Sequence, residues 1–123
     1  MRTMLPSGPV TDSDWSPKRV LVVDANPDRL RLIGLRLRAE GYRVLGAMDG
    51  IMATHVATTE RPDVIVLDSS MADARGQSLA RRWRSHIGTM AIPIVPLLSP
   101  GETEGPSDLL TLVEQASSRR PAR

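Results

Sequence analysis

Two aspartates follow apolar runs that have the pattern of buried strands. Asp24 closes a run of valine and leucine at residues 20–23, and Asp68 closes a second run at residues 64–67. If both runs are parallel strands, their carboxyl ends lie at one edge of a sheet, where sites form in open α/β folds. Two carboxylates in one crevice can hold a divalent cation and allow one of them to attack phosphorus. Spacing alone leaves open the alternative that they are two solvated acids at strand ends.

The elements that would position these acids alternate between strands and helices. The apolar runs predict strands at 19–23, 42–47, 64–67 and 92–98. Helices are predicted at 26–40, at 51–61, around Leu79, Ala80 and Trp83, and last in a segment capped by Ser107 that carries Leu109, Leu112, Val113 and Ala116. In the 51–61 helix, one side carries Met52, Ala53, Val56 and Ala57. Such alternation indicates βαβ crossovers and a parallel sheet.

Local signals fix several boundaries. Asn26, Pro27 and Asp28 supply a cap, a first-position proline and a first-turn acid, and Gly41 is a suitable residue to follow the end of the helix. Pro96 lies in the middle of the fourth predicted strand. Because proline cannot donate a hydrogen bond to a neighbouring strand, we expect this strand at a sheet edge.

Composition limits the class of protein. The chain of 123 residues suits one domain, with a proline-containing arm at 1–17, a folded unit at 18–118 and a basic tail at 119–123. The absence of cysteine excludes disulfides and thiolate metal sites. No run suits a signal peptide or a membrane span, so we expect a cytoplasmic protein without membrane contact. Arginine supplies all but one of the 16 basic residues, but no aromatic residues alternate with them, so nucleic acid is an unfavoured partner.

From Lys18 to about Leu98 the chain resembles the receiver domain of two-component response regulators. The resemblance rests on KRVLVVDANPD, EGYRV, the AMDG turn, RPDVIVLD, a glycine eight residues beyond Asp68, and AIPIVPLL, in that order and spacing. It implies a flavodoxin-like, doubly wound parallel sheet. We expect this sheet to be truncated to about four strands in the order 2-1-3-4.

The resemblance implies site roles position by position. Asp68 matches the phosphoacceptor, and Asp24 matches the first of a pair of acids that bind magnesium. The second acid of that pair is replaced by Ala25. Ser70 lies where the family supplies a backbone carbonyl to the metal. Asp24, Asp68 and Ser70 would therefore hold magnesium, but with a carboxylate missing we expect weak binding.

Two further family positions are altered. The switch threonine or serine falls on Leu98, with Ser99 next to it, and the lysine of the fifth strand has no counterpart because Lys18 is the only lysine. The segment after Pro100 also leaves no room for the fourth helix and fifth strand of an ordinary receiver. We therefore expect that much of the surface that reports phosphorylation in the family is missing here.

The first helix carries two apolar stripes. Leu30, Ile33 and Leu37 share one face, whereas Leu32 and Leu35 lie on another. Arginines, including Arg29 and Arg36, fill the flanks between the stripes. Leu32 and Leu35 belong either to a broad core face or to a partner surface. The expected assembly of the chain is a homodimer.

These features predict a stand-alone signalling domain of a phosphorelay that works by protein–protein contact and is not an enzyme. Its partner would be a sensor histidine kinase or a phosphotransfer protein. One alternative is an interaction module that acts independently of phosphorylation. Another is a small magnesium-dependent phosphatase that uses Asp24 and Asp68, although no general acid stands at a suitable spacing.

Overall fold

The computed structural model describes residues 17–72, 78–97 and 106–118. The elements are β1 (Arg19–Val23), α2 (Pro27–Ala39), β2 (Arg43–Ala47), α3 (Gly50–Glu60), β3 (Val64–Asp68), α4 (Leu79–Arg84), β4 (Ile94–Leu97) and α5 (Pro106–Ser118). Four parallel strands form one sheet in the order β2-β1-β3-β4. The predicted strand order is confirmed. The predicted arm, apart from Pro17, and the predicted tail lie outside the described residues.

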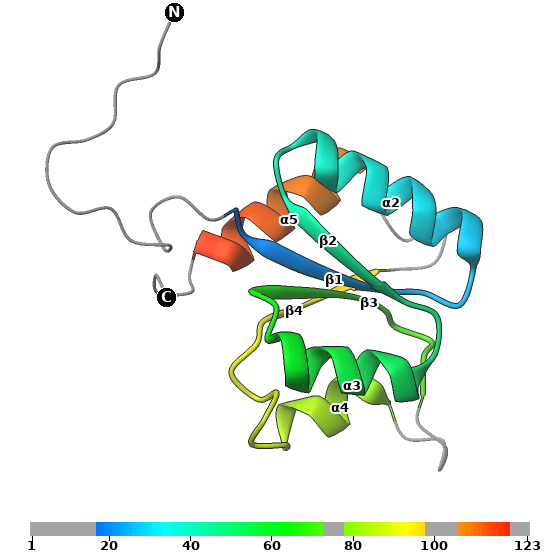
Figure 1. Ribbon diagram of the computed structural model, residues 1–123, viewed down its shortest axis with the longest axis vertical. Coiled ribbons are helices and arrows are strands. Elements are labelled where there is room, and N and C mark those ends of the chain that lie inside the picture. Colours follow the sequence, from blue (N-terminus) through cyan, green and yellow to red (C-terminus); the bar gives the residue numbers. More distant parts are fainter. Residues whose placement is uncertain (1–16, 73–77, 98–105, 119–123) are drawn as a thin grey trace, which may run out of the picture.

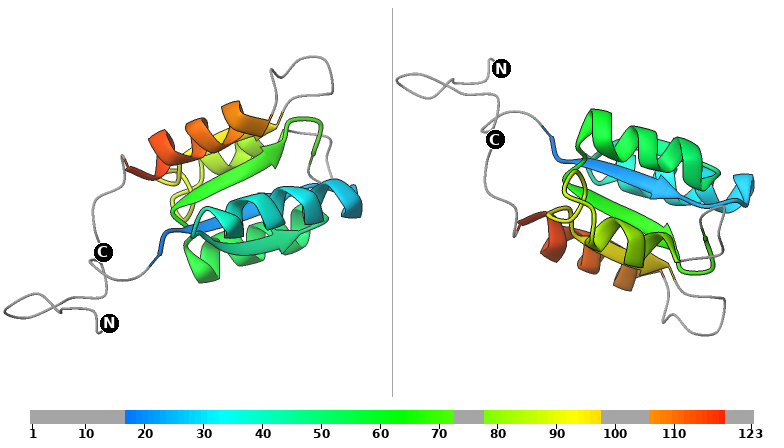
Figure 2. Two further views of the ribbon diagram at one scale, coloured as in Figure 1. Left: turned by 90° about the horizontal axis from the view of Figure 1, so that it is seen from above. Right: turned by 90° about the horizontal axis from the view of Figure 1, so that it is seen from below.

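Helices cover both faces of the sheet (Figure 1). The two views of Figure 2 show α2 and α5 on one side and α3 and α4 on the other. β1 and β3 lie in the middle, so their side chains are buried on both faces. One apolar cluster joins the central strands to Ile33, Leu37, Val113 and Ala116, and the other joins them to Ala53, Ala57, Leu79 and Trp83. Among the described residues, no helix has the length and apolar character needed to cross a membrane.

The predicted signals at the ends of α2 act as expected. The Asn26 side chain accepts hydrogen bonds from the backbone N–H groups of Asp28 and Arg29, at 3.0 and 3.2 Å. Pro27 begins the helix, where its missing N–H group costs no hydrogen bond. Gly41 follows the helix with a φ of 95°, a conformation that a residue with a Cβ atom rarely adopts. Asn26 and Pro27 thus fix where the first turn of α2 begins after β1, and Gly41 allows the chain to turn away at the other end of the helix.

β4 lies at an edge of the described sheet, as Pro96 predicts. The carbonyls of Pro93 and Leu97 accept hydrogen bonds from Ile65 and Ser69 of the β3 side, at 3.0 and 3.3 Å. Because pairing groups alternate along a strand, the nitrogen of Pro96 faces away from β3. Proline therefore occupies a position where the missing donor breaks no hydrogen bond of this sheet. The strand begins at Ile94, later than the predicted residue 92, and the predicted last residue, Leu98, lies outside the described residues.

α3 packs on the sheet through Ala53 and Ala57, whereas Met52 on the same side of the helix is 49% exposed. One local expectation is wrong. Ser107 was expected to cap the last helix, but α5 already begins at Pro106. A proline suits the first position of a helix, which moves the start one residue earlier than the serine signal indicates.

Candidate functional site

Asp24 lies at the carboxyl end of β1 and is fully buried. Its Oδ1 accepts a hydrogen bond from the backbone N–H of Asn26 at 2.9 Å. Its own backbone N–H donates to the carbonyl of Ala47 at 3.1 Å, which continues the pairing with β2 by one residue. A buried carboxylate is costly unless a positive group and hydrogen bonds compensate its charge, so a cation close to Asp24 is expected on physical grounds.

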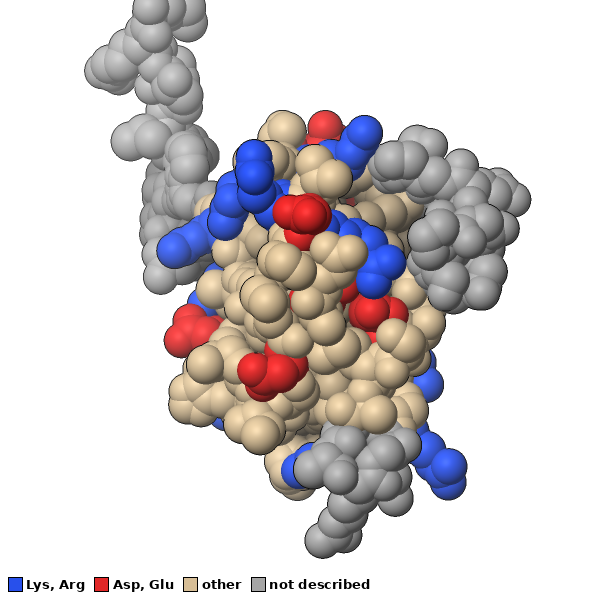
Figure 3. All heavy atoms as spheres, turned by 90° about the vertical axis from the view of Figure 1, so that its right-hand side faces the viewer, with Lys and Arg blue, Asp and Glu red and all other residues tan. Residues whose placement is uncertain are grey.

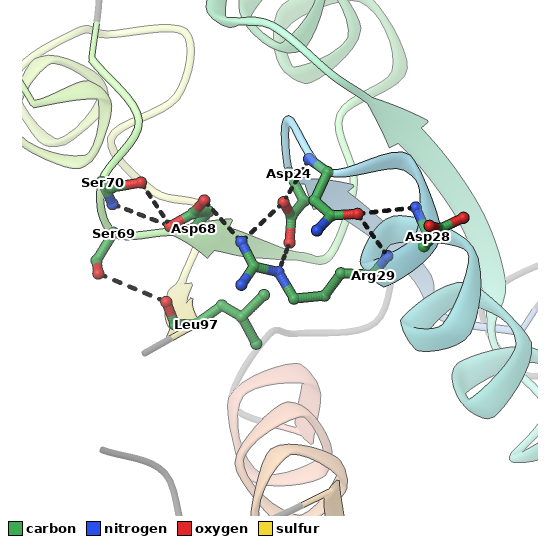
Figure 4. Close-up of polar contacts among 8 residues, drawn as sticks. Asp24, Asp28, Arg29, Asp68, Ser69, Ser70 and Leu97 are labelled. Carbon is green, nitrogen blue, oxygen red and sulfur yellow. Dashed lines mark hydrogen bonds and ion pairs between the residues drawn. The ribbon is translucent and has the colours of Figure 1, made fainter. Parts of the chain in front are cut away.

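Asp68 ends the neighbouring strand, β3, and its side chain is 14% exposed. Its Oδ1 accepts two hydrogen bonds from Ser70, one from the backbone N–H at 3.0 Å and one from the hydroxyl at 2.9 Å. These bonds hold the carboxylate at the edge of the sheet and leave Oδ2 directed toward Asp24 and α2 (Figure 4).

The Arg29 side chain connects the two carboxylates. Its Nε donates to Oδ2 of Asp24, and its Nη2 donates to Oδ1 of Asp24 at 3.0 Å and to Oδ2 of Asp68 at 3.1 Å. Figure 4 shows the guanidinium between the two acids, reaching back from the first turn of α2. The hydrogen bond to Asp24 is the largest cause that raises the pKa of Arg29 above its ordinary value, and the charges of Asp24 and Asp68 add to it while burial opposes it. The guanidinium is therefore a permanent positive charge in the crevice.

The structure brings together three of the residues that the sequence singled out, namely Asp24, Asp68 and Ser70. Asp24 and Asp68 share one crevice, and Ser70 touches Asp68 through its N–H and hydroxyl groups. Ala25 is exposed and contributes no carboxylate. Leu98 and Ser99 lie outside the described residues, but Leu97, just before them, is the register partner of Asp68. Leu32 and Leu35 lie on α2 and are 62% and 48% exposed, as expected of a second stripe that the sheet does not bury.

Arg29 is the site residue that sequence reasoning missed. It was assigned to the flank of the first helix together with Arg36, and this assignment is wrong for Arg29. Side chains in a helix point back toward its N-terminus, so a residue of the first turn can reach the preceding strand end. The signal was present as a need for charge balance, because a buried Asp24 requires a positive neighbour and the chain has no lysine after Lys18 to supply one.

The donors present do not fit a resident divalent metal ion. Such ions require about six oxygen ligands, several of them carboxylates. Here every oxygen of Asp24 and Asp68 already accepts a hydrogen bond, and a guanidinium lies between the two side chains. Over the described residues, no group of three histidine, cysteine or acidic side chains is close enough to hold a metal. Figure 3, which views this end of the sheet, shows acidic and basic side chains interspersed and no single dense acidic patch.

Comparison with known proteins identifies a protein family. The family model of the response regulator receiver domain matches residues 20–104. The chain is 34% identical over 92 residues to the probable transcriptional regulatory protein TcrX of Mycobacterium tuberculosis, a match that covers 75% of this chain and 38% of that protein. It is 36% identical over 101 residues to the response regulator PleD of Caulobacter vibrioides, covering 76% and 22% of the two chains. The chain thus spans well under half the length of these relatives.

Solved structures share the fold. A response regulator from Chloroflexus aurantiacus superposes with a TM-score of 0.71 at 23% identity, over 84% of this chain and 99% of the other. The receiver domain of a Pseudomonas aeruginosa sensor histidine kinase, solved with a magnesium ion coordinated in its active-site cleft, gives the same TM-score, identity and coverage. With the sheet order, the two aspartates at adjacent strand ends and the match over residues 20–104, these findings show that the chain belongs to the response regulator receiver domain family of two-component signalling.

Proposed function

We propose that this chain is a receiver-like signalling module that works by protein–protein contact, with Asp68 at the phosphoacceptor position of an incomplete site. The observation that carries the proposal is the crevice itself. Asp68 ends β3 beside Asp24, as a receiver requires, but Ala25 offers no carboxylate and a guanidinium lies between the acids. We assign the module to the cytoplasm and to a partner that is a sensor histidine kinase or a phosphotransfer protein.

We expect weak magnesium affinity and slow or absent phosphorylation of Asp68. An added phosphoryl group would be transferred to an oxygen of Asp68 while the donor's leaving group departs, and this step depends on positioning and on neutralised charge. With one metal-binding acid missing, that neutralisation is incomplete. Incubation with acetyl phosphate and magnesium, followed by intact mass measurement, should show little of the phosphorylated form.

The matched control is Asp68→Asn, which removes the acceptor but keeps the side chain's size. Any modification of the native chain should disappear in this variant. Rapid and stoichiometric modification of Asp68 in the native chain, together with tight magnesium binding, would contradict the proposal of an incomplete site and favour a phosphorylation-driven switch.

We further propose that Leu32 and Leu35 form a contact surface through which two copies of the chain associate as a symmetric homodimer. Both leucines are exposed on α2, the helix that also supplies Arg29 to the crevice. Burying an aliphatic side chain contributes about 1.5–3 kcal/mol, so the two leucines that each copy supplies across a two-fold axis favour association. The contact would lie on α2, the helix whose Arg29 touches Asp68. The position where a phosphoryl group would be added and the surface that binds the second copy would therefore lie close together.

Leu35→Glu tests this surface. We expect it to raise the dissociation constant of the dimer about tenfold or more, because each copy of the interface would bury a charge. Stability of the isolated chain should change by less than about 0.5 kcal/mol, since the residue is exposed. Sedimentation at low micromolar concentration and urea denaturation give the two readouts. Ile87→Glu is the control, because Ile87 is 88% exposed and lies beyond α4. A native chain that sediments as a monomer would argue against the surface, and so would equal effects of the two variants.

A further inference from the structure

We infer that Arg29 is a built-in cation that takes the place of a divalent metal in the Asp24–Asp68 crevice, so that this receiver is assembled without metal. The inference deepens the proposed function and rests on it only for the role of Asp68 as the phosphoacceptor position. It concerns how the crevice is held together, and it can be tested without any signalling partner.

Charge balance supports the inference. Asp24 has no exposed surface, and Asp68 lies beside it with a side chain that is 14% exposed. Among the described residues, the only salt bridges of both acids are those with Arg29. Removing one partner of a buried ion pair is strongly destabilising, because the remaining charge is left without compensation. Without Arg29, the two carboxylates would therefore need another positive group between them.

Geometry supports it as well. The Nε and Nη2 groups of Arg29 form a fork on Asp24, and Nη2 also reaches Asp68, so one planar group links both strand ends to α2. A guanidinium matches carboxylates in this bidentate way, whereas an ammonium acts as a point charge. The Asn26 cap fixes the first turn of α2 and therefore the starting point of the Arg29 side chain.

This arrangement implies that a metal ion and the Arg29 guanidinium compete for the same carboxylate oxygens. A metal ion that enters the crevice must displace the guanidinium from the same carboxylate oxygens, and it finds Ala25 where a further acid would help. The native chain should therefore gain little from magnesium. A variant that lacks the guanidinium but keeps both acids should be less stable without metal and should respond to it.

The experiment measures thermal unfolding of the full chain by circular dichroism in EDTA and in about 10 mM magnesium chloride, with sodium chloride matched for ionic strength. Arg29→Met keeps most of the side-chain stem and removes the charge. We expect its unfolding temperature in EDTA to fall by roughly 5–15 °C. Magnesium should restore several degrees to this variant, because a ligand that binds only the folded chain stabilises it. The native chain should shift by less than about 1 °C.

Arg36→Met is the matched control, because Arg36 is an exposed arginine of the same helix two turns further on. It should behave like the native chain in both buffers. If Arg29→Met does not fold in EDTA, folding of that variant on addition of magnesium supports the inference. If it folds in neither buffer, Arg29→Lys decides, and we expect an intermediate unfolding temperature with a small magnesium response.

Three results would overturn the inference. One is an equal magnesium response of the native chain and Arg29→Met, and another is an Arg29→Met variant as stable in EDTA as Arg36→Met. The third arises when Arg29→Met cannot fold, and it is an Arg29→Lys variant that also fails to fold in both buffers, since a positive charge at this position would then not be what holds the crevice together. Failure of the proposed function would instead be detected by the acetyl phosphate and sedimentation experiments. The unfolding experiment uses neither of these measurements, so the two failures can be distinguished.

Discussion

Replacement of Trp83 by alanine is expected to lower the free energy of unfolding by about 3–5 kcal/mol. Trp83 is 1% exposed and is the largest side chain of the cluster between the sheet, α3 and α4. The chain contains no phenylalanine that could relax into the space. The indole also donates a hydrogen bond from Nε1 to the hydroxyl of Thr54 at 3.0 Å, which ties α4 to α3. Because α4 has only six residues, this anchor accounts for much of its position.

Urea denaturation followed by circular dichroism measures the effect, since the substitution removes the buried fluorophore. Trp83→Phe separates packing from hydrogen bonding, and it should cost about 1–2 kcal/mol because the ring is kept and the donor is lost. The Thr54 hydroxyl still donates to the carbonyl of Gly50 at 2.8 Å, so it is not left without a partner. Arg84→Ala, on the exposed side of the same helix, is the control. A loss below about 1 kcal/mol for Trp83→Ala would show that the short helix is held by other contacts.

Substitution of Ala25 by aspartate is expected to lower the dissociation constant for magnesium about tenfold or more, because affinity for such ions rises steeply with the number of carboxylate ligands. Ala25 is exposed and follows Asp24 directly, so a carboxylate can be added there without disturbing the core. Arg29 still competes for the same oxygens, so Ala25→Asp combined with Arg29→Met should bind magnesium more tightly than Ala25→Asp alone. Isothermal titration with magnesium chloride measures both.

The added charge has a second consequence. Three acids with one guanidinium repel one another, so Ala25→Asp should be less stable than the native chain in EDTA and should regain stability in magnesium. Ala39→Asp places the same charge at the far end of α2 and serves as the control. Equal magnesium affinity of Ala25→Asp and Ala39→Asp would show that the crevice cannot be rebuilt as a metal site by this one residue.

The helix α2 links the two surfaces on which the proposed function rests. Its first turn supplies Arg29 to Asp68, and its next turns present Leu32 and Leu35. A change at Asp68 that releases Arg29 would therefore act first on the helix that carries the proposed contact surface.

Local chemistry was sufficient to predict the framework. The apolar runs before Asp24 and Asp68 predicted central strands, because a short strand that is buried on both faces is apolar without alternation. Asn26, Pro27 and Gly41 predicted the limits of α2, because capping depends on neighbouring residues alone. Pro96 predicted the sheet edge, because a missing donor excludes a central position. Helical spacing identified Leu32 and Leu35 as a second apolar stripe. The parallel arrangement of the strands predicted that the two aspartates lie at one edge of the sheet.

Tertiary structure decided which charges meet. Arg29 and Asp68 lie 39 residues apart, and no local pattern connects them. Periodicity assigned Arg29 to a helix flank, because it cannot take account of a buried carboxylate on the preceding strand that needs a counter-charge. The hydrogen bond between Trp83 and Thr54 and the exposure of Met52 depend in the same way on how α3 and α4 settle on the sheet. Sequence therefore determined the strand ends that carry the acids, and packing determined that a guanidinium fills the space between them.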